Sequence, residues 1–141
     1  MGRIKTDKEL KFSKKKYKEI EDQLKEMKKN PTGKVLEKAG FFGLQAFGED
    51  IKFEIEEYEK IKAGKVPEYL LKSSSPQSLG DALIALRIAS GKTQSDLAKD
   101  LEVASTQICR DERNEYHGIS SVRLFKILDL LGYDIEIKKK K

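Results

Sequence analysis

Apolar residues recur at steps of three and four along the first half of the chain, and this period predicts two amphipathic helices. The first runs from about residue 13 to residue 29 and stops at the turn signals Pro31 and Gly33. The second ends near Gly64, a candidate C-cap, with Pro67 just beyond it. Together they predict an N-terminal helical hairpin within residues 1–72. The two apolar stripes consist of Tyr17, Ile20, Leu24 and Met27, and of Leu44, Phe47, Ile51, Ile55, Tyr58 and Ile61.

A serine-rich segment, residues 73–78, is predicted to be the linker between two domains. Residues 79–132 then show several short helical patterns with start signals and predict a compact, all-α domain of four to five helices. The start signals are Ser78 with Asp81, Thr93 with Asp96, and Ser120. The last helix is expected to end at Gly132 and to bury Val122, Leu124, Phe125, Ile127, Leu128 and Leu131.

The pattern changes to period two in residues 133–137, where Tyr133, Ile135 and Ile137 alternate with acidic residues. This alternation predicts a β-strand within the C-terminal segment 133–141. A lone strand leaves its backbone groups unpaired, so it needs the same strand of a second subunit. A frayed tail is the alternative, and both remain open. Lys138–Lys141 would add attraction to a polyanion.

The charge of the chain is unevenly distributed. The net charge is +5, and residues 1–29 hold 11 basic against 6 acidic residues. Residues 73–137 hold 7 basic against 10 acidic residues, so this region is net acidic. A nucleic-acid binder built on such a domain has to concentrate positive charge locally or take it from the chain ends.

Several classes of protein are not expected from the composition. A single cysteine and a single histidine argue against a disulfide framework and a Cys/His zinc site. We expect no enzyme, no cofactor and no metal, since neither a Gly-rich phosphate loop nor a nucleophile–base arrangement is present. The chain contains no apolar run near the roughly 20 residues of a membrane span. It also starts without an apolar signal segment, so a cytoplasmic location is expected.

A short polar helix is predicted over residues 104–113, after a helix that starts at Thr93 and a tight turn at 102–104. Its exposed residues fall at i, i+1, i+4, i+5 and i+8, which is one continuous face. Hydroxyl groups and arginine forks suit base edges in the major groove, as in a helix-turn-helix. Spacing alone equally allows a solvated polar face. The face comprises Ser105, Thr106, Cys109, Arg110 and Arg113, whereas Ile108 and Glu112 point toward the rest of the domain.

Residues 79–132, 54 of the 141, resemble the XRE family of phage-repressor-type helix-turn-helix domains. The resemblance implies a lambda-repressor-like fold for this domain. More faintly, the whole chain resembles a subgroup with an N-terminal hairpin that ends in Tyr58, Glu59, Lys62 and Gly64. The family motif stands here as Gly91, Thr93, Gln94, Leu97, Ala98 and Leu101, followed by Val103, Ile108, Glu112 and the closing "LLG" of 130–132.

The resemblance implies roles for single positions. Arg87 and Glu112 match a pair that forms a buried salt bridge. Gln94 matches a glutamine that binds a phosphate while it braces the reading helix. Base contacts are expected from Ser105, Thr106, Gln107 and Arg110, and phosphate contacts from Thr93, Gln94, Arg113 and Asn114.

Two positions depart from the family pattern. Glu102 occupies a turn position where the family usually has glycine, and a left-handed non-glycine residue costs about 1 kcal/mol. We therefore expect a distorted or lengthened turn there. Ala104 replaces the usual Ser or Thr cap, and Ser105 could serve as the cap one residue later, away from the bases.

The function expected from these observations is a sequence-specific, DNA-binding transcription regulator that acts as a homodimer and reads the major groove with helix 104–113. An antitoxin that binds a toxin protein and represses its own promoter is one alternative. A protein–protein adaptor that has lost DNA binding is another, and the acidic balance of 73–137 is its main support.

Overall fold

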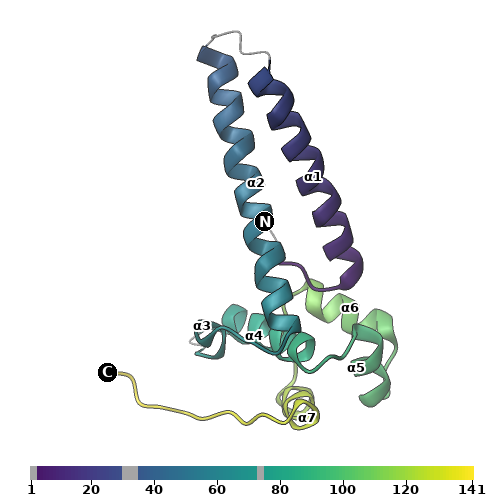
Figure 1. Cartoon of the computed structure of the whole chain (residues 1–141). Helices are drawn as coiled ribbons and strands as arrows, with labels where there is room; N and C mark the ends of the chain where they lie inside the picture. The colour runs from purple at the N-terminus through teal and green to yellow at the C-terminus, as the bar shows by residue number, and fades with distance from the viewer. Residues whose placement is uncertain (1–2, 30–34, 73–74) are drawn as a thin grey trace. The chain divides into compact units, whose positions relative to one another are not determined.

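The computed structural model describes residues 3–29, 35–72 and 75–141, and all regular structure in them is helical (Figure 1). The expected all-α class is therefore confirmed. Contacts group the chain into two compact units, Met1–Glu59 and Lys60–Lys141. The helices are α1 (Asp7–Lys29), α2 (Val35–Lys62), α3 (Glu68–Leu71), α4 (Pro76–Ala89), α5 (Gln94–Asp100), α6 (Ser105–Arg113) and α7 (Ser121–Leu131).

Helix α1 starts about two turns earlier than its apolar stripe predicts. Thr6 and Glu9 form a reciprocal capping box: the Thr6 hydroxyl accepts from the Glu9 N–H, and the Glu9 carboxylate accepts from the Thr6 N–H, both at 3.2 Å. The "T-x-x-E" signal at 6–9 was therefore the true start, and the predicted start near residue 13 was wrong. The predicted stop at Pro31 and Gly33 lies outside the described residues.

In the first unit, α1 and α2 lie side by side and run antiparallel (Figure 1). Their closest approach is at Gly48, where an added Cβ would lie 3.1 Å from the Ile20 side chain. Ile20, Ile51 and Ile55 are buried along this contact. Near the other end, the Tyr58 hydroxyl donates to the Asp7 carboxylate at 2.9 Å. Helix α2 starts at Val35, ahead of Leu44, the first residue of its predicted apolar stripe.

In the second unit, α4 is the central helix, with every residue from Ala82 to Ile88 buried. It contacts α3 and α7, while α5 contacts α6. The N-cap of α4 is Ser75, whose side chain accepts from the Ser78 N–H, so the predicted start at Ser78 was wrong. Pro76, at the first helical position, favours this earlier start. The helix therefore includes part of the segment 73–78 that we predicted as a linker.

Helix α7 starts at the predicted cap, because the Ser120 side chain accepts from the Arg123 N–H, and it ends at left-handed Gly132. Two of its six predicted core residues are exposed, Val122 at 66% and Phe125 at 52%. Phe125 is three residues from the buried Leu128 and so lies at the edge of the buried side, while Val122 lies further round the helix. The apolar pattern of 122–131 is broader than one helix face, and only part of it finds a partner in this chain.

The predicted strand at 133–137 is not formed. Residues 133–141 continue beyond α7 without regular structure, as the yellow end of the chain shows (Figure 1). Within this single chain the segment pairs with no other strand among the described residues, so no ladder of hydrogen bonds can form. Tyr133, Ile135 and Ile137 are all exposed.

Gly80 of α4 should not tolerate a side chain, because an added Cβ would lie 2.0 Å from the Glu115 carbonyl oxygen. We expect Gly80→Ala to lower the free energy of unfolding by about 1–3 kcal/mol, the usual range for overpacking. Gly43 is the matched control, since nothing lies within 4 Å of its added Cβ. Gly43→Ala should stabilise the helix by about 0.5–1 kcal/mol. Urea denaturation followed by circular dichroism measures both, and equal effects would contradict the close approach.

Candidate nucleic-acid interface

Helices α5 and α6 are joined by a tight turn of four residues, 101–104. Glu102 adopts a left-handed conformation with φ of 57°, the conformation for which glycine is usual. The Glu102 N–H donates to the Lys99 carbonyl at 3.2 Å, and the Val103 N–H donates to the Ala98 carbonyl at 2.9 Å. Both bonds close the end of α5 in the normal way. The expected distortion is therefore absent, and the glutamate takes the strained conformation instead.

Helix α6 has one buried side and one exposed side. Ile108 and Glu112 are fully buried. The exposed residues of the helix are Ser105, Thr106, Arg110 and Arg113, while Gln107 and Cys109 are half-buried. The exposed side is thus composed of two hydroxyls and two guanidinium groups.

The buried side of α6 is held by an ion pair. Glu112 accepts two hydrogen bonds from the Arg87 guanidinium of α4, at 2.5 Å from Nε and 2.9 Å from Nη2. These are the two residues that the family resemblance pairs. Arg87 Nη1 also donates to the Lys92 carbonyl at 2.7 Å, in the segment between α4 and α5. One arginine therefore connects α4, the start of α5 and α6.

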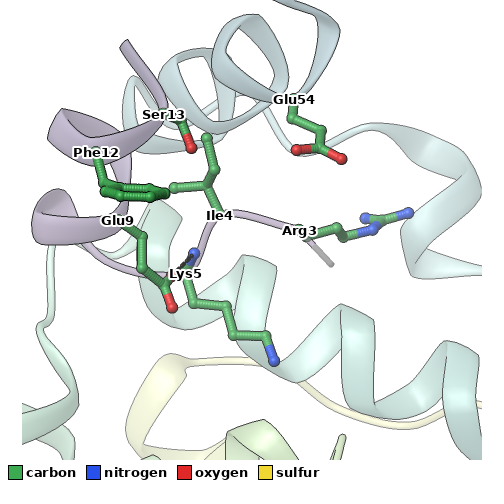
Figure 2. Close-up of a pocket in the computed structure, with 7 residues that line it drawn as sticks. All are labelled: Arg3, Ile4, Lys5, Glu9, Phe12, Ser13 and Glu54. Carbon is green, nitrogen blue, oxygen red and sulfur yellow. Dashed lines mark hydrogen bonds between the residues drawn. The ribbon is translucent and has the colours of Figure 1, made fainter. Parts of the chain in front are cut away.

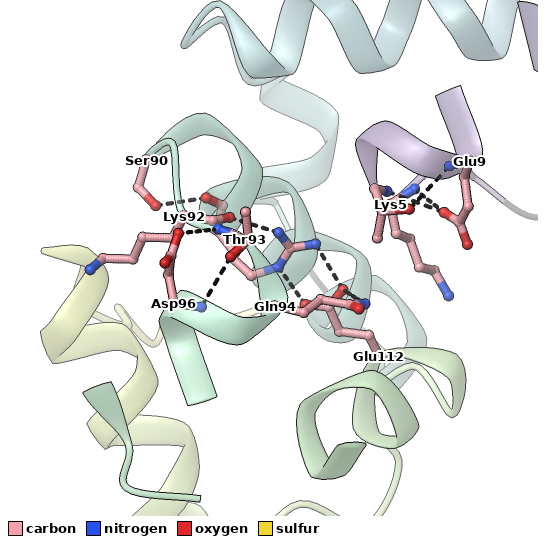
Figure 3. Close-up of polar contacts among 10 residues, drawn as sticks. Lys5, Glu9, Ser90, Lys92, Thr93, Gln94, Asp96 and Glu112 are labelled. Carbon is pink, nitrogen blue, oxygen red and sulfur yellow. Dashed lines mark hydrogen bonds and ion pairs between the residues drawn. The ribbon is translucent and has the colours of Figure 1, made fainter. Parts of the chain in front are cut away.

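Gln94, the first residue of α5, joins the same cluster. Its side-chain amide nitrogen donates to Glu112 Oε1 at 2.9 Å (Figure 3). This bond braces the N-terminus of α5 against α6, as the resemblance implies for this glutamine. The Glu112 carboxylate thus receives donors from two helices, which compensates for its complete burial.

The N-terminus of α5 is closed by the predicted capping box. The Thr93 hydroxyl accepts from the Asp96 N–H at 3.0 Å, and the Asp96 carboxylate accepts from the Thr93 N–H at 2.9 Å (Figure 3). The Thr93 backbone and hydroxyl bonds lower the pKa of Asp96 below its usual value. A hydroxyl that accepts can still donate, so Thr93 retains a proton for an external acceptor.

Gln107 behaves differently from the other predicted base-contacting residues. Its amide nitrogen donates to Asp111 Oδ1 at 2.8 Å, and Asp111 also pairs with Arg123 of α7 at 3.1 Å. The side chain is therefore engaged within the domain and only half-exposed. Asp111 and Arg123 are not among the predicted site residues, although the i, i+4 spacing of Gln107 and Asp111 is visible in the sequence.

Helix α6 begins without a side-chain cap. Its N-cap is Ala104, which makes no side-chain capping bond, and Ser105 is the first helical residue. The alternative in which Ser105 becomes the cap is therefore wrong, and its hydroxyl stays on the exposed side. Backbone N–H groups at the start of a helix are suitable donors to an anion.

The C-terminal end of α6 is an irregular turn. Asn114 is the C-cap residue, and its amide makes a long bond of 3.4 Å to the His117 carbonyl. Glu115 and Tyr116 both have positive φ, at 53° and 56°. Tyr116 is buried, and burial first, then the nearby Glu112 carboxylate, raises the pKa of its phenol above the usual value. Arg113 and Asn114 are both exposed here, where a polyanion could reach them.

A separate cavity of about 300 Å³ lies in the first unit (Figure 2). Arg3 and Lys5 face it together with Glu9 and Glu54, and the ring of Phe12 closes one side. Burial raises the pKa of Glu54, and the nearby Asp50 and Glu57 raise it further. Charges of both signs line this cavity, so it favours no single class of ligand.

Within the described residues, no group of three or more His, Cys, Asp or Glu side chains could hold a metal ion. None of the helices over the same residues is both long and apolar enough to cross a membrane. Comparisons with protein-family models, with curated proteins and with solved structures find no match to this chain.

Removing one partner of the buried pair should destabilise the second unit strongly. Glu112→Ala leaves the Arg87 guanidinium buried without its counter-charge, and we expect a loss of about 3–5 kcal/mol in the free energy of unfolding. The double variant Arg87→Met, Glu112→Leu should recover about half of that loss or more, because it leaves no unpaired charge. Glu68→Ala, which removes the exposed Lys72–Glu68 pair, is the control and should have little effect. A double variant no more stable than Glu112→Ala in urea denaturation would contradict this interpretation.

Proposed function

We propose that the chain is a sequence-specific, DNA-binding transcription regulator, in which α5 and α6 form a helix-turn-helix and α6 reads the major groove. The observation that supports this most is the two-sided character of α6. One side is anchored by fully buried Ile108 and Glu112, and the other presents Ser105, Thr106 and Arg110 to solvent. The Arg87–Glu112 ion pair and the buried Ile108 hold α6 in one orientation, so its exposed side is presented in a fixed direction.

In this proposal, Ser105, Thr106 and Arg110 contact base edges. Arginine forms bidentate hydrogen bonds with guanine, and the hydroxyls can donate or accept. Gln107 takes a lesser part, because its amide already donates to Asp111. Thr93 and Gln94 at the start of α5, with Arg113 and Asn114 at the end of α6, contact phosphates and set the register of the protein on the duplex.

We further propose that the regulator acts as a homodimer. Val122, Phe125 and Leu130 are exposed apolar side chains of α7, and Tyr133, Ile135 and Ile137 extend this exposure beyond the helix. A second copy of the chain could cover these side chains and pair with the 133–137 segment, whose alternation fits a strand. A two-fold dimer would place two α6 helices on half-sites about one helical turn apart.

The reading face is tested by substituting Arg110. On a duplex recovered by selection, Arg110→Ala should weaken binding by about 1–3 kcal/mol, and the discrimination against a scrambled duplex should fall with it. Lys52→Ala, which removes an equal charge from an exposed position of α2, is the matched control and should leave discrimination unchanged. If Arg110→Ala retains full discrimination in fluorescence anisotropy, α6 is not the reading helix.

The dimer is tested by deleting residues 133–141. We expect the full-length chain to show a dimer mass by analytical ultracentrifugation and the truncated chain to shift toward monomer, because the pairing segment is lost. A second variant, Phe125→Glu, should have the same effect through the exposed side chains of α7 alone. An unchanged dimer mass in both variants would place the interface elsewhere.

An antitoxin is the second candidate, favoured by the outer face of α2. Phe42 and Phe53 are 64% and 63% exposed there, among several acidic residues. A basic toxin could dock on such a face while the second unit represses the shared promoter. A neighbouring gene for a toxin whose product binds the full chain, but not Phe53→Glu, would support this candidate. If no such binding is found, the transcription regulator is the one of the two candidate functions that remains.

A further inference from the structure

The lysines of α1 divide into two sets. Lys14 pairs with Glu59 of α2 at 3.6 Å, while Lys16 and Lys28 lie over the Phe47 and Phe41 rings, at 5.0 and 5.9 Å from the centroids. The second set is exposed and follows steps of three, four, three, seven and four residues, which places its members on one face of the helix. This lysine stripe consists of Lys8, Lys11, Lys15, Lys18, Lys25 and Lys29.

The stripe lies on the side of α1 opposite to its apolar stripe. Ile20, Leu24 and Met27 fall half a turn away from it in a helical projection, and Ile20 is buried against α2. Helix α2 therefore covers the apolar side of α1 and leaves the lysine stripe exposed to solvent. The packing between α1 and α2 is enough to determine that the lysines of the stripe point into solvent.

The positive charge of the stripe is largely unneutralised in its N-terminal half, whereas Lys29 pairs with Glu26 at 4.0 Å. Among the described residues, none forms an ion pair with Lys8, Lys11, Lys15 or Lys18. Over residues 8–18 the sequence holds six lysines and a single acidic residue, Glu9. With a rise of 1.5 Å per residue, a step of three or four residues sets one ammonium group about every 5 Å along the axis. Like charges so close repel one another, and a polyanion would relieve that repulsion.

We infer that the lysine stripe of α1 is a second nucleic-acid contact, which binds the phosphate backbone of duplex DNA without regard to sequence. The inference rests on the proposed function for its choice of polyanion. Residues 73–137 hold 7 basic against 10 acidic residues, so the domain with the reading helix lacks the charge for strong phosphate binding. The stripe supplies this charge from a separate helix, with the affinity set by counterion release.

A membrane surface fits the stripe less well. Helices that bind membranes insert an apolar face beside their basic face. The apolar side of α1 packs against α2, and Phe12 is the only large apolar side chain that this fully described helix exposes.

The test compares two variants of the full chain that lose the same charge. The stripe variant carries Lys8→Gln, Lys11→Gln, Lys15→Gln and Lys18→Gln, which keeps good helix formers in place. The control carries Lys38→Gln, Lys52→Gln, Lys60→Gln and Lys65→Gln, all exposed and outside the stripe. Binding to a labelled duplex of arbitrary sequence is measured by anisotropy over a salt series, with circular dichroism to verify the helix content.

For the stripe variant, the slope of log K against log salt should become shallower by about 2–4, since each phosphate contact contributes about 0.9. The control should change it by less than about 1. Equal slopes for both variants would overturn the inference. Loss of binding to anionic vesicles in the stripe variant, with duplex binding unchanged, would also overturn it in favour of a membrane.

The inference and the proposed function can fail separately. In one outcome, the wild-type protein prefers no sequence and the stripe variant loses the salt-dependent binding to duplex DNA. The inference then stands, and the proposed reading by α6 is excluded. In the opposite outcome, sequence discrimination depends on Arg110 and the stripe variant leaves the salt slope unchanged. The proposed function then stands, and the inference is excluded.

Discussion

The buried contact between Arg87, Glu112 and Gln94 is the interaction on which the candidate interface depends. A carboxylate with no exposure is strongly unfavourable unless it is paired and hydrogen-bonded. Here the guanidinium of α4 binds it in a fork, and the Gln94 amide supplies a third donor. Because the three residues come from α4, α5 and α6, these donors fix how α6 is rotated about its own axis. That rotation decides that Arg110 faces solvent while Ile108 lies in the core.

A second constraint comes from the backbone. Gly80 meets the Glu115 carbonyl so closely that only a glycine fits, and Glu115 and Tyr116 both adopt left-handed conformations to complete the turn after α6. Glu102 adopts the same conformation between α5 and α6. Non-glycine residues pay about 1–2 kcal/mol each for it. Local backbone strain is thus present at both ends of α6, and the packing of the core compensates for it.

The sequence predicted the helices of the second unit better than its surfaces. Capping chemistry at Thr93 and Ser120 is local and could be read directly, as could the apolar period of α1 and α2. The "T-x-x-E" signal at 6–9 marks the start of α1 ahead of its apolar stripe. The N-cap of α4 is Ser75 and not Ser78, because Pro76 favours the first helical position. The exposure of Phe125, the Gln107–Asp111–Arg123 network and the fit at Gly80 depend on contacts between helices, which periodicity does not specify. The strand at 133–137 could not form without a second strand.

The central claim is that this chain reads DNA sequence, and a selection of the purified protein against random duplex DNA at near-physiological salt tests it most directly. Phosphate contacts alone give affinity without preference, whereas a face with Ser105, Thr106 and Arg110 should favour particular base pairs. The account predicts an enriched, approximately palindromic motif with half-sites about one helical turn apart. Recovery of no motif, with only weak binding that vanishes as salt rises, would contradict it and favour an adaptor that binds protein.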